Sequence, residues 1–565
     1  MVLKFLILLT IIFFSDLYSQ IEKETRAVWV STNFRLDWPP PTFESNLQKQ
    51  SLIEILDNIK SKNLNTVYFQ VRSNGTLLCK SSFEPLSPYI TGKVNGKADY
   101  DPLDFAIEQA HIRGLEIHAW VNVVRCFSGK DNFILTDSNH IFKRKPQWVV
   151  EYNDSGNISY WLDPGFPEVR DYLSNLITEI VKNYDIDGIQ LDFLRYPGKN
   201  FNDSFSYNQY GNSEQKDKWR RENITKILES VYEKIKSIKP YVKVGVAPIG
   251  IYKNENGYYF EGYGDVYQDS KAWLQKGIVD YLVPQVYWGI NDKPDFAALA
   301  KSWVSSSFNR NIIIGIAAYK NNVKEQIDKL IEYCRDIHSN GVSFFRYSNI
   351  KEYNFKSFSY KAIPSEMSWL NKFYPIPPQN LSFTLSQDNP YTVKLSWQIQ
   401  KSSSKYDSAV YIALYNLPKP SAGAKSQFLL DIIDANKNTV TFEIKNPQKI
   451  NYYFALKSLN RFWQESNETS NVIEIKLNQL SQFAYLDDLL PKPMLLKNNN
   501  DHSEILLFSK EKETVKISFG NLNMTERRTI YPGKNVLIIQ NDLTASREIQ
   551  IEFETTKKKF NLSLE

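Results

Sequence analysis

The chain has 565 residues, which is too long for a single hydrophobic core and predicts roughly two to four domains. A hydrophobic fraction of 42% is that of an ordinary globular protein, and a net charge of only +5, with basic and acidic residues interspersed, excludes an obvious nucleic-acid binder. The aromatic fraction of 14% is high. Large aromatic cores account for most of these residues, and flat surfaces on which sugar rings or nucleobases stack are the alternative.

The N-terminus carries the features of a signal peptide. Lys4 precedes the ten-residue apolar run FLILLTIIFF, and the small residue Ser19 follows where a signal peptidase could cut. The run is too short for a membrane anchor, no cysteine follows it closely, and no second apolar stretch reaches membrane-spanning length. We therefore expect a signal peptide at 1–19 and an exported, soluble protein in the periplasm or outside the cell, without membrane insertion.

The cysteines and histidines indicate no bound group. Cys79, Cys126 and Cys334 lie far apart and form no CxxC pair, so neither a disulfide framework nor a thiolate zinc site is expected. The five histidines are scattered as well. The sequence thus predicts no metal and no cofactor.

Short apolar runs alternate with long amphipathic ones from Arg26 to about Tyr374. The short runs predict strands at 26–31, 66–72, 115–123, 188–194, 242–248, 280–288, 311–319 and 341–348. Helical patterns such as LQKQSLIEILDNIKSKN and PEVRDYLSNLITEIVKNY lie between them. This alternation favours an α/β fold, a TIM-like (β/α)8 barrel with enlarged loops over 20–374, rather than an open doubly wound sheet.

Local signals mark several helix ends. Asp101 and Asp163 each precede a proline, as N-terminal caps do. Gly114 and Gly277 follow helical patterns where C-terminal caps belong. We expect these four residues to cap helices.

The pattern changes after the proline-rich linker FYPIPPQ. Alternating strands fill 375–478, which is typical of an immunoglobulin-like sandwich, and Trp397 in an early strand with Tyr452 and Tyr453 in a late one resembles a fibronectin type III module. Further strand patterns predict one more small all-β domain at 479–565. Neither region clusters His, Cys or carboxylates, so both are expected to be spacers or binding modules.

Polar residues recur on one face of the predicted barrel strands. Such strands are covered by helices outside and packed inside, so polar side chains in them need an explanation. Alternate positions share a face, and the inward set near the strand ends is Gln70, Arg72, His118, Trp120, Asn122, Gln190, Asp192, Gln285 and Tyr287. The pattern predicts a cleft at the C-terminal end of the barrel, where active sites of this fold lie.

Each of these residues also has a structural explanation. Asp192 could form an ion pair with Arg195 or Arg72, and His118 is better explained as a hydrogen-bonded core residue than as a base. Single aromatic residues are more often core than sugar platforms. The convergence of four strands favours the functional interpretation, because a structural one needs a separate partner for each polar group.

Several segments of the predicted barrel also resemble one known family. They are RAVWVSTNFRLDWP, NTVYFQVRSNG, DPLDFAIEQAHIRGLEIHAWVN, LDPGFPEVRDYL, DIDGIQLDFLRYP, GYGDVYQDSKAWLQKGIVDYLVPQVYW and AAYK, in this order between residues 24 and 374. Together they resemble the glycosyl-hydrolase-like family ten of exported bacterial proteins. The resemblance implies a TIM barrel that hydrolyses O-glycosidic bonds of a polymeric glycan, with bacterial cell-wall glycan among the implied substrates.

Glycoside hydrolysis usually needs two carboxyl groups, one that donates a proton and one that acts as nucleophile or activates water. Asp192 matches the family's acid on strand four and is the first expected catalytic residue. Many relatives carry a second acid beside it, where this chain has Phe193, which parity directs outward. The expected second catalytic residue is Asp265, in a loop that matches a family motif, and the alternatives are Asp269, Glu84 and Asp163.

The remaining residues are expected to bind the substrate. Arg195 adjoins Asp192 and should lower the pKa of its carboxyl, which suits a nucleophile or charge stabiliser better than a proton donor. Amides would bond sugar hydroxyls, and aromatic rings would stack on sugars. The predicted substrate-binding set is Gln70, Arg72, Trp120, Asn122, Arg195, Tyr196, Gln285, Tyr287, Trp288 and Tyr319.

Two other classes of protein remain open. A carbohydrate-binding protein on a degenerate barrel is the alternative, since strand seven ends in AAY and supplies no second acid. A metal-dependent polysaccharide deacetylase or amidase needs a cluster of His and Asp that the sequence does not supply. The expected partner is a polysaccharide or the glycan strand of peptidoglycan, and no nucleic acid.

Overall fold

The computed structural model describes residues 23–476 and 492–563, apart from short gaps at 256, 258–259, 372, 387–391, 403, 405, 445–450, 499–501, 510–511, 521–523, 532, 541–547 and 556. The signal peptide expected at 1–19 lies outside the described residues. Among the described residues, no helix is long and apolar enough to span a membrane.

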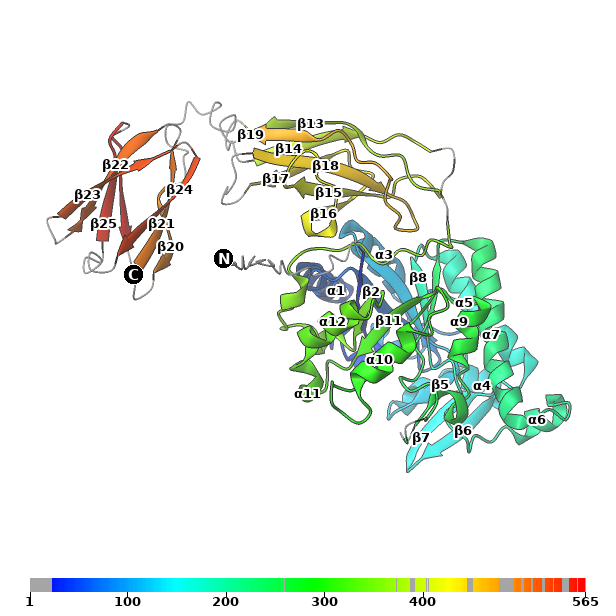
Figure 1. Cartoon of the computed structure of the whole chain (residues 1–565). Coiled ribbons are helices and arrows are strands. Elements are labelled where there is room, and N and C mark those ends of the chain that lie inside the picture. Colours follow the sequence, from blue (N-terminus) through cyan, green and yellow to red (C-terminus); the bar gives the residue numbers. More distant parts are fainter. Residues whose placement is uncertain are drawn as a thin grey trace, which may run out of the picture.

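Eight parallel strands close into the barrel that the sequence predicts (Figure 1). Each strand pairs with the next, and β1 pairs with both β2 and β12 to close the ring. The strands are β1 (Thr25–Val30), β2 (Thr66–Ser73), β4 (Glu116–Asn122), β8 (Gly188–Asp192), β9 (Lys243–Val246), β10 (Tyr281–Leu282), β11 (Asn311–Ile316) and β12 (Gly341–Phe344). All eight lie within or close to the predicted runs, so the predicted fold class is confirmed.

A helix follows each barrel strand from β1 to β11 and packs on the outside. These helices are α1 (Ser45–Ser61), α3 (Pro102–Ile112), α5 (Pro167–Asn183), α7 (Lys216–Ile238), α9 (Ser270–Lys276), α10 (Phe296–Val304) and α12 (Ile327–Asp336). Short helices occur in the loops: α2 (Pro88–Thr91), α4 (Ile141–Arg144), α6 (Ser204–Tyr210), α8 (Gly262–Asp265), α11 (Asn321–Lys324) and α13 (Tyr347–Ile350). The covering helices explain why the strands are apolar on both faces.

Side chains of the barrel strands alternate between the interior and the helix layer as the sequence predicts. Trp29, Tyr68 and Trp120 pack together inside the barrel, whereas intervening residues such as Phe69 and Leu191 join the core beneath the helices. In the register between β4 and β8, Trp120 lies beside Gln190, and Asn122 lies beside Asp192. The inward parity therefore brings these polar groups to the C-terminal end of the barrel.

Three of the four expected helix caps are confirmed. The Asp101 carboxylate accepts hydrogen bonds from two backbone N–H groups of the first turn of α3. Gly114 and Gly277 adopt φ of +67° and +69° just after α3 and at the end of α9, a backbone conformation that glycine adopts without strain.

The expectation for Asp163 as a helix cap is wrong. Helix α5 begins at Pro167 and has Phe166 at its N-cap position, because a turn separates it from Asp163. The Asp163 carboxylate instead accepts hydrogen bonds from Gly165 N (2.8 Å) and the Ser206 hydroxyl (2.6 Å). It holds the loop before α5 against α6.

An inserted antiparallel sheet follows β4 and was not expected from the sequence. It consists of β5 (Arg125–Ser128), β7 (Asn157–Leu162) and β6 (Val149–Asp154), in this spatial order. Figure 1 shows it beyond the C-terminal ends of the barrel strands, at the lower end of the molecule in that view. The short β3 (Thr76–Leu77) extends the barrel sheet next to β2.

The next segment folds as a two-layer sandwich. One sheet has the order β13-β14-β17 and the other β16-β15-β18-β19. Trp397 and Tyr452 lie in the core between the sheets, whereas Tyr453 packs on the other side of its strand. The strands are β13 (Gln379–Leu385), β14 (Thr392–Gln398), β15 (Tyr411–Leu417), β16 (Leu429–Asp434), β17 (Thr439–Glu443), β18 (Asn451–Leu459) and β19 (Ile473–Lys476).

The last described segment forms a second small β unit with its own core. Its sheets have the orders β20-β21-β24 and β23-β22-β25-β26. The strands are β20 (Met494–Asn498), β21 (His502–Ser509), β22 (Glu513–Phe519), β23 (Met524–Ile530), β24 (Gly533–Gln540), β25 (Glu548–Phe553) and β26 (Lys559–Ser563).

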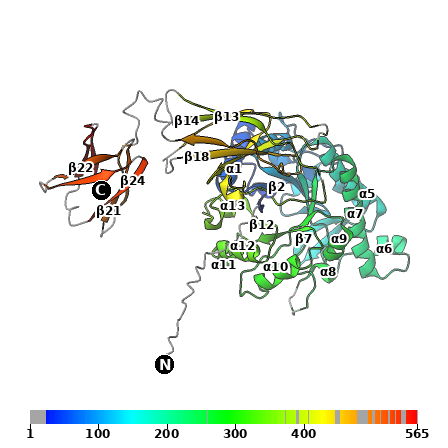
Figure 2. The ribbon, with the colours of Figure 1, turned by 45° about the horizontal axis from the view of Figure 1, so that its top comes forward.

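The sandwich packs against the N-terminal ends of the barrel strands, opposite the inserted sheet (Figures 1 and 2). Arg461 forms ion pairs with Asp185 (2.8 Å) and Asp187 (2.9 Å), just before β8. A Cβ on Gly114 would lie 2.8 Å from the Ile432 side chain, so only glycine permits this close approach. The C-terminal end of the barrel is therefore left for the site.

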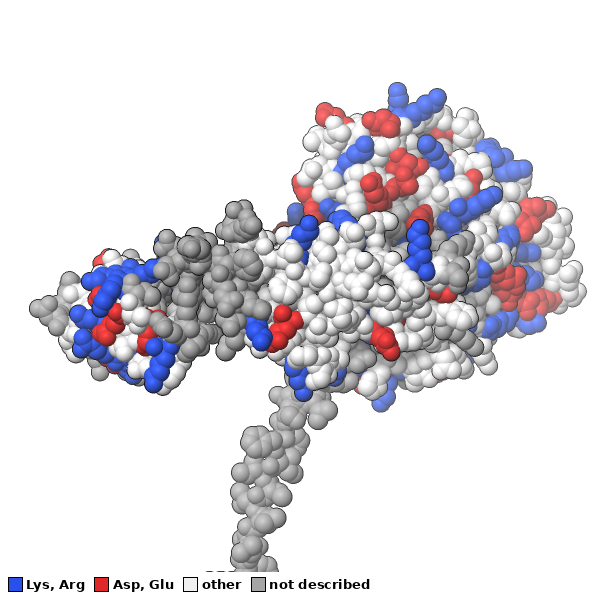
Figure 3. Space-filling view, turned by 90° about the horizontal axis from the view of Figure 1, so that it is seen from above, with Lys and Arg blue, Asp and Glu red and all other residues white. Residues whose placement is uncertain are grey.

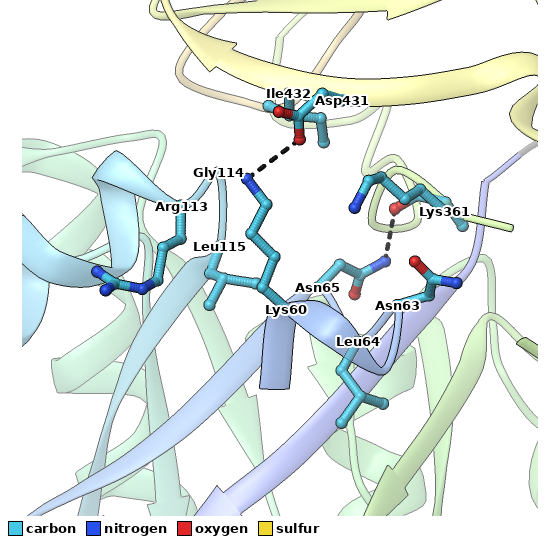
Figure 4. A pocket seen from close by; sticks show the side chains of 11 residues that line it. Lys60, Asn63, Leu64, Asn65, Arg113, Gly114, Leu115, Lys361, Asp431 and Ile432 are labelled. Atoms are coloured by element: carbon cyan, nitrogen blue, oxygen red, sulfur yellow. Dashed lines mark hydrogen bonds and ion pairs between the residues drawn. The ribbon is translucent and has the colours of Figure 1, made fainter. Parts of the chain in front are cut away.

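A small pocket lies in this junction (Figure 4). The Lys60 ammonium reaches across it to Asp431 (3.1 Å), and Asn65 donates to Ala362 O (2.9 Å). Its volume of about 20 Å³ suits a single water molecule and no larger ligand.

Seen from the sandwich side, basic and acidic side chains are interspersed over the surface (Figure 3).

Candidate active site

Asp192 ends β8 and lies at the C-terminal mouth of the barrel. It is 7% exposed. Its Oδ1 accepts hydrogen bonds from its neighbour Phe193 N (2.8 Å) and from Gln285 Nε2 (3.4 Å). Strand β8 thus ends on a buried carboxyl that other barrel strands surround.

Arg195 acts to lower the pKa of Asp192 as expected, but the net effect of the surroundings is to raise it, so the expected low pKa is wrong. Burial disfavours the charged carboxylate, and this effect outweighs the Phe193 N–H and the Arg125 and Arg195 guanidiniums, which all favour it. The Trp120 indole N–H also favours the carboxylate, although it completes no hydrogen bond. A raised pKa suits a proton donor better than a nucleophile.

Unpartnered polar groups surround this carboxyl. Asn122, Gln190 and Trp120 are between 0% and 3% exposed. Within the described residues, both amide atoms of Asn122 and Gln190 and the indole nitrogen of Trp120 have no hydrogen-bond partner. Buried polar groups normally have partners, so this set can bond hydroxyl groups of a ligand or water.

A cleft of about 920 Å³ opens at Phe193, the residue after Asp192, between the inserted sheet and the loops after β8 and β9. Asp192 itself is not among the residues that line it. Tyr152, Ile158 and Trp161 line it from the inserted sheet, and Phe260 lines it from the loop after β9. Charged residues also line it, namely Arg125, Lys130, Asp154, Arg195, Lys199 and Asp265. Its size and its mixture of aromatic and charged groups suit several sugar units.

Phe193 lines this cleft, so the expectation that it faces outward is wrong. Its φ of +51° ends the strand alternation directly after Asp192 and redirects the ring. The ring makes an edge contact with Trp161 (5.8 Å between centroids). The Arg125 and Arg195 guanidiniums lie 3.6 and 5.0 Å from its centroid.

Arg125 is a functional candidate that the sequence did not reveal. The ladder between β4 and β8 continues through Val123 and Val124, whose N–H groups donate to Asp192 O (2.8 Å) and Phe193 O (3.2 Å). Arg125 is the next residue after Val124, so its side chain lies beside Phe193. The alternating pattern around the turn in VVEYNDSGNISYWL was the available signal for the sheet that carries this wall.

Gln70 and Arg72, predicted to bind substrate, are engaged inside the protein. The side-chain Oε1 of Gln70 accepts hydrogen bonds from the Ser31 hydroxyl and from the backbone N–H groups of Thr32 and Asn33, and so holds the loop after β1. Arg72 is fully buried and bonds both oxygens of Glu84, at 2.5 and 2.8 Å, as well as the carbonyl groups of Asn122 and Val123. The alternative acid Glu84 is therefore held in a buried ion pair.

The other expected acids differ in position. Asp265 lines the cleft, accepts from Glu261 N (2.9 Å) and forms an ion pair with Lys199 (2.7 Å). Asp269 accepts from the Tyr252 hydroxyl (2.7 Å). Burial raises the pKa of Asp163 to about 6, but that carboxyl is bonded in its own loop.

The predicted aromatic residues divide between mouth and core. Tyr287 packs against Tyr319 and Phe345, and burial and the nearby Asp192 raise the pKa of its hydroxyl. Tyr319 is 48% exposed. Trp288 lies half-buried under the Lys320 ammonium. Tyr196 is fully buried against Phe201 and Tyr267 and does not reach the cleft surface.

Within the described part of the chain, no group of three or more His, Cys, Asp or Glu side chains is placed to hold a metal ion. The predicted histidine assignment is confirmed, because His118 Nδ1 shares a 2.6 Å hydrogen bond with the Tyr281 hydroxyl inside the barrel. The three cysteines are buried free thiols.

A closed (β/α)8 barrel with a buried carboxyl beside an aromatic-lined cleft defines a TIM-barrel protein of the glycosidase type. The chain belongs to the glycosyl hydrolase-like 10 family, whose profile matches residues 24–332. Glycosyl hydrolase YngK of Bacillus subtilis is 31% identical over 485 residues, which are 79% of this chain and 93% of that protein. Glycosyl hydrolase DigH of Escherichia coli K12 is 36% identical over 328 residues, which are 53% and 74% of the two chains.

Solved structures show more distant similarity. The glycoside hydrolase domain of PgaB (BpsB) from Bordetella bronchiseptica is 12% identical, with a TM-score of 0.44, and the match covers 58% of this chain and 96% of that domain. The endo-1,4-beta-mannanase of Rhizomucor miehei is 14% identical, with a TM-score of 0.37, over 57% and 86% of the two chains.

Proposed function

We propose that this protein is an exported glycoside hydrolase that cleaves O-glycosidic bonds of a polymeric glycan, with bacterial cell-wall glycan as its first candidate substrate. The observation that carries the proposal is Asp192, a buried carboxyl of raised pKa at the C-terminal end of a barrel strand, beside a cleft of about 920 Å³. Family membership supports the reaction class.

The proposed mechanism assigns the two predicted carboxyls different roles. Asp192, whose carboxyl pKa is raised by burial, donates a proton to the glycosidic oxygen. Asp265 supplies the second carboxylate, as nucleophile or as the base that activates water. Its ion pair with Lys199 must open or rearrange when the substrate binds.

The proposed substrate-binding roles go to polar groups that have no hydrogen-bond partner within the described residues. Asn122 and Gln190 have unpartnered amides close to Asp192, and they are proposed to bond hydroxyls of the sugar at the cleavage point. Tyr152 and Trp161 of the inserted sheet, with Tyr287 and Tyr319 at the mouth, are proposed to supply stacking surfaces. Gln70, Arg72 and Tyr196 are proposed to support the site without touching the sugar.

The roles of the other segments are also proposals. The apolar N-terminal run supports export to the periplasm or the medium. We propose a three-part division at 374/375 and 478/479, of which the second boundary lies outside the described residues. Separate sheets for the barrel, the sandwich and the last β unit support it. The sandwich, with three strands in one sheet and four in the other, is proposed to be a fibronectin type III-like module that supports the barrel.

The test is product analysis by mass spectrometry after incubation with purified peptidoglycan, with and without its stem peptides, beside a panel of plant and microbial polysaccharides. Asp192→Asn should lower the hydrolysis rate about 10²- to 10⁴-fold while glycan binding persists. Asp171→Asn, an exposed change on α5, is the matched control and should leave the rate unchanged. An unchanged rate in Asp192→Asn contradicts the catalytic assignment.

A carbohydrate-binding protein without catalysis is the second candidate. The observation that favours it is that Glu84, Asp163 and Asp269 are engaged within the protein and Asp265 is paired with Lys199. This candidate predicts glycan binding with no cleavage of any polymer in the panel. Glycan binding without any cleavage product would contradict the hydrolase proposal and support the binding protein.

A further inference from the structure

We propose that the cleft beside Asp192 binds a carboxylate carried by the sugar substrate, and that Arg125 and Arg195 bind it. The inference rests on the proposed glycan function and adds the substrate class: an acidic glycan, whose carboxylate belongs either to a uronic acid or to a carboxyl-ether substituent of the sugar. Arg125 has no role in the mechanism above, and Arg195 gains a specific one.

The two guanidiniums lie over aromatic rings of the cleft. The Arg125 and Arg195 Cζ atoms lie 3.6 and 5.0 Å from the centroid of the Phe193 ring, and Arg195 Cζ also lies 5.4 Å from the centroid of the Trp161 ring. A contact between a guanidinium and a ring face uses none of the N–H donors that bind a carboxylate. Arg195 donates one hydrogen bond, to Tyr196 O (3.1 Å), and within the described residues neither arginine forms an ion pair.

The charges around the cleft are not balanced by the protein. Four cationic side chains line it, Arg125, Lys130, Arg195 and Lys199, against the carboxylates of Asp154 and Asp265. Asp265 is already paired with Lys199. The excess of positive charge next to the two arginines favours an anionic ligand.

Asp192 is a weak counter-ion for these arginines. Burial lowers the pKa of Arg125 and of Arg195 to about 10, so both stay charged at neutral pH, and Asp192 is the carboxyl that most favours their charged forms. Burial raises the pKa of Asp192 itself. Within the described residues Asp192 forms no ion pair with either guanidinium, and a substrate carboxylate would supply the counter-ion that both lack.

The backbone places both arginines close in the chain to the residues that pair with Asp192 and Phe193. Arg125 follows the ladder that joins Val123 and Val124 to Asp192 and Phe193, and Arg195 lies three residues after Asp192. Both arginines therefore belong to the strand ends that carry the proposed proton donor. The carboxylate would sit on the sugar at the cleavage point or on its direct neighbour.

The test measures binding separately from hydrolysis. Every protein carries Asp192→Asn so that probes stay intact, and calorimetry gives Kd. The probes are a galacturonic acid hexamer and its full methyl ester, and peptide-free peptidoglycan glycan strands before and after amidation of their carboxyl groups. Each pair keeps the sugar backbone and removes the charge, and the two pairs distinguish uronic acids from carboxyl-ether sugars.

The proposal expects the carboxylated member of one pair to bind at least about tenfold more tightly than its neutral counterpart. Arg125→Gln and Arg195→Gln should each abolish most of this preference without weakening binding of the neutral probe. Arg125→Lys should retain part of it, and 1 M salt should reduce it. Lys182→Gln, which removes an equal charge from the exposed face of α5, is the control and should not change it.

Equal binding of charged and neutral probes, or a preference that survives both glutamine variants, would overturn the proposal. These outcomes are distinguishable from a failure of the proposed function. A protein that hydrolyses neutral polymers without preferring acidic ones keeps the function and loses the anion site. A protein that binds acidic probes through Arg125 but cleaves no glycan keeps the anion site and loses the hydrolase.

Discussion

Asp192 is a buried carboxyl that the folded barrel holds preferentially in its protonated form. Because burial raises its pKa above the ordinary value of 3.8, the folded state binds a proton that the unfolded state has already lost as pH rises. The carboxylate therefore reduces the free energy of unfolding at pH values above its folded pKa. This cost in stability accompanies the proposed role as proton donor.

We predict that Asp192→Asn increases the free energy of unfolding at pH 7. Asparagine keeps an oxygen that can accept from Phe193 N and Gln285 and carries no charge. The gain should shrink as pH falls and vanish below the ordinary carboxyl pKa, where the aspartate is protonated in both states. Urea denaturation at several pH values measures it, and a variant less stable than the parent at pH 7 would contradict the burial argument.

Arg72 and Glu84 carry a prediction about stability rather than catalysis. Both side chains are fully buried and form a two-point ion pair. Arg72→Met leaves the Glu84 carboxylate without its cation, which should cost about 3–5 kcal/mol of unfolding free energy. The double variant Arg72→Met with Glu84→Gln should recover part of the loss. If Arg72→Met is as stable as the parent but loses glycan binding, Arg72 has the substrate role that the sequence suggested.

At the scale of elements, the inserted sheet and the loop after β8 form two facing walls of the cleft. A Cβ on Gly198 would lie 2.3 Å from the Tyr152 hydroxyl of β6, so glycine at 198 allows this ring to lie over the loop. Tyr152 is only partly buried, and it can move instead of straining the backbone. The position of one aromatic wall residue thus depends on one missing methyl group.

We predict that Gly198→Ala weakens glycan binding about threefold to tenfold, which corresponds to an aromatic contact of ~1 kcal/mol, with little change in stability. Adding Tyr152→Phe removes the hydroxyl that the new methyl group meets and should restore most of the affinity. Tyr152→Phe alone is the control. Titration with the glycan that the parent binds is the measurement, and no recovery in the double variant would show that Tyr152 does not mediate the effect.

The elements that periodicity describes were predictable, and the residues beyond them were not. All eight barrel strands and the inward parity of Trp120 and Asp192 follow from alternation within strands. The alternation of inward and outward side chains stops where a strand ends. It therefore gave the wrong direction for Phe193 and no position for Arg125. Sequence proximity to Arg195 also misjudged the pKa of Asp192, because burial, which only the folded barrel defines, is the larger effect. The ion pair of Arg72 with Glu84 was not predictable either, because the two residues lie on different segments.

At the scale of the molecule, the sandwich and the cleft occupy opposite ends of the barrel. The sandwich contacts the loops before β4 and β8 through Ile432 and Arg461, and the last turn of α1 through Asp431. The inserted sheet lies at the C-terminal end of the barrel. The sandwich therefore supports the barrel without lining the cleft. Changes at this junction should alter stability and leave glycan binding by the folded protein unchanged.

Arg461 and Lys60 offer a matched comparison across this junction. Arg461 and Asp187 have side-chain exposures of 10% and 1%, whereas Lys60 and Asp431 have 30% and 39%. We predict that Arg461→Met costs about 3–5 kcal/mol of unfolding free energy, because the buried Asp187 loses its cation. Lys60→Met breaks the more exposed pair and should cost less than about 1 kcal/mol. Equal effects of the two variants in calorimetry would contradict this account of the junction.

The same pair predicts how stability depends on acid. Burial acts to raise the pKa of Asp187, but Arg461 and His111 outweigh it and hold that pKa below its ordinary value of 3.8. The folded state thus releases this proton more readily than the unfolded state, so the contribution is present above about pH 4 and is lost as pH falls further. In Arg461→Met this acid-dependent loss should diminish, because the main cation that lowers the pKa is gone. Unfolding midpoints between pH 2 and 6 test it: parallel pH profiles for parent and variant would show that Arg461 does not control Asp187.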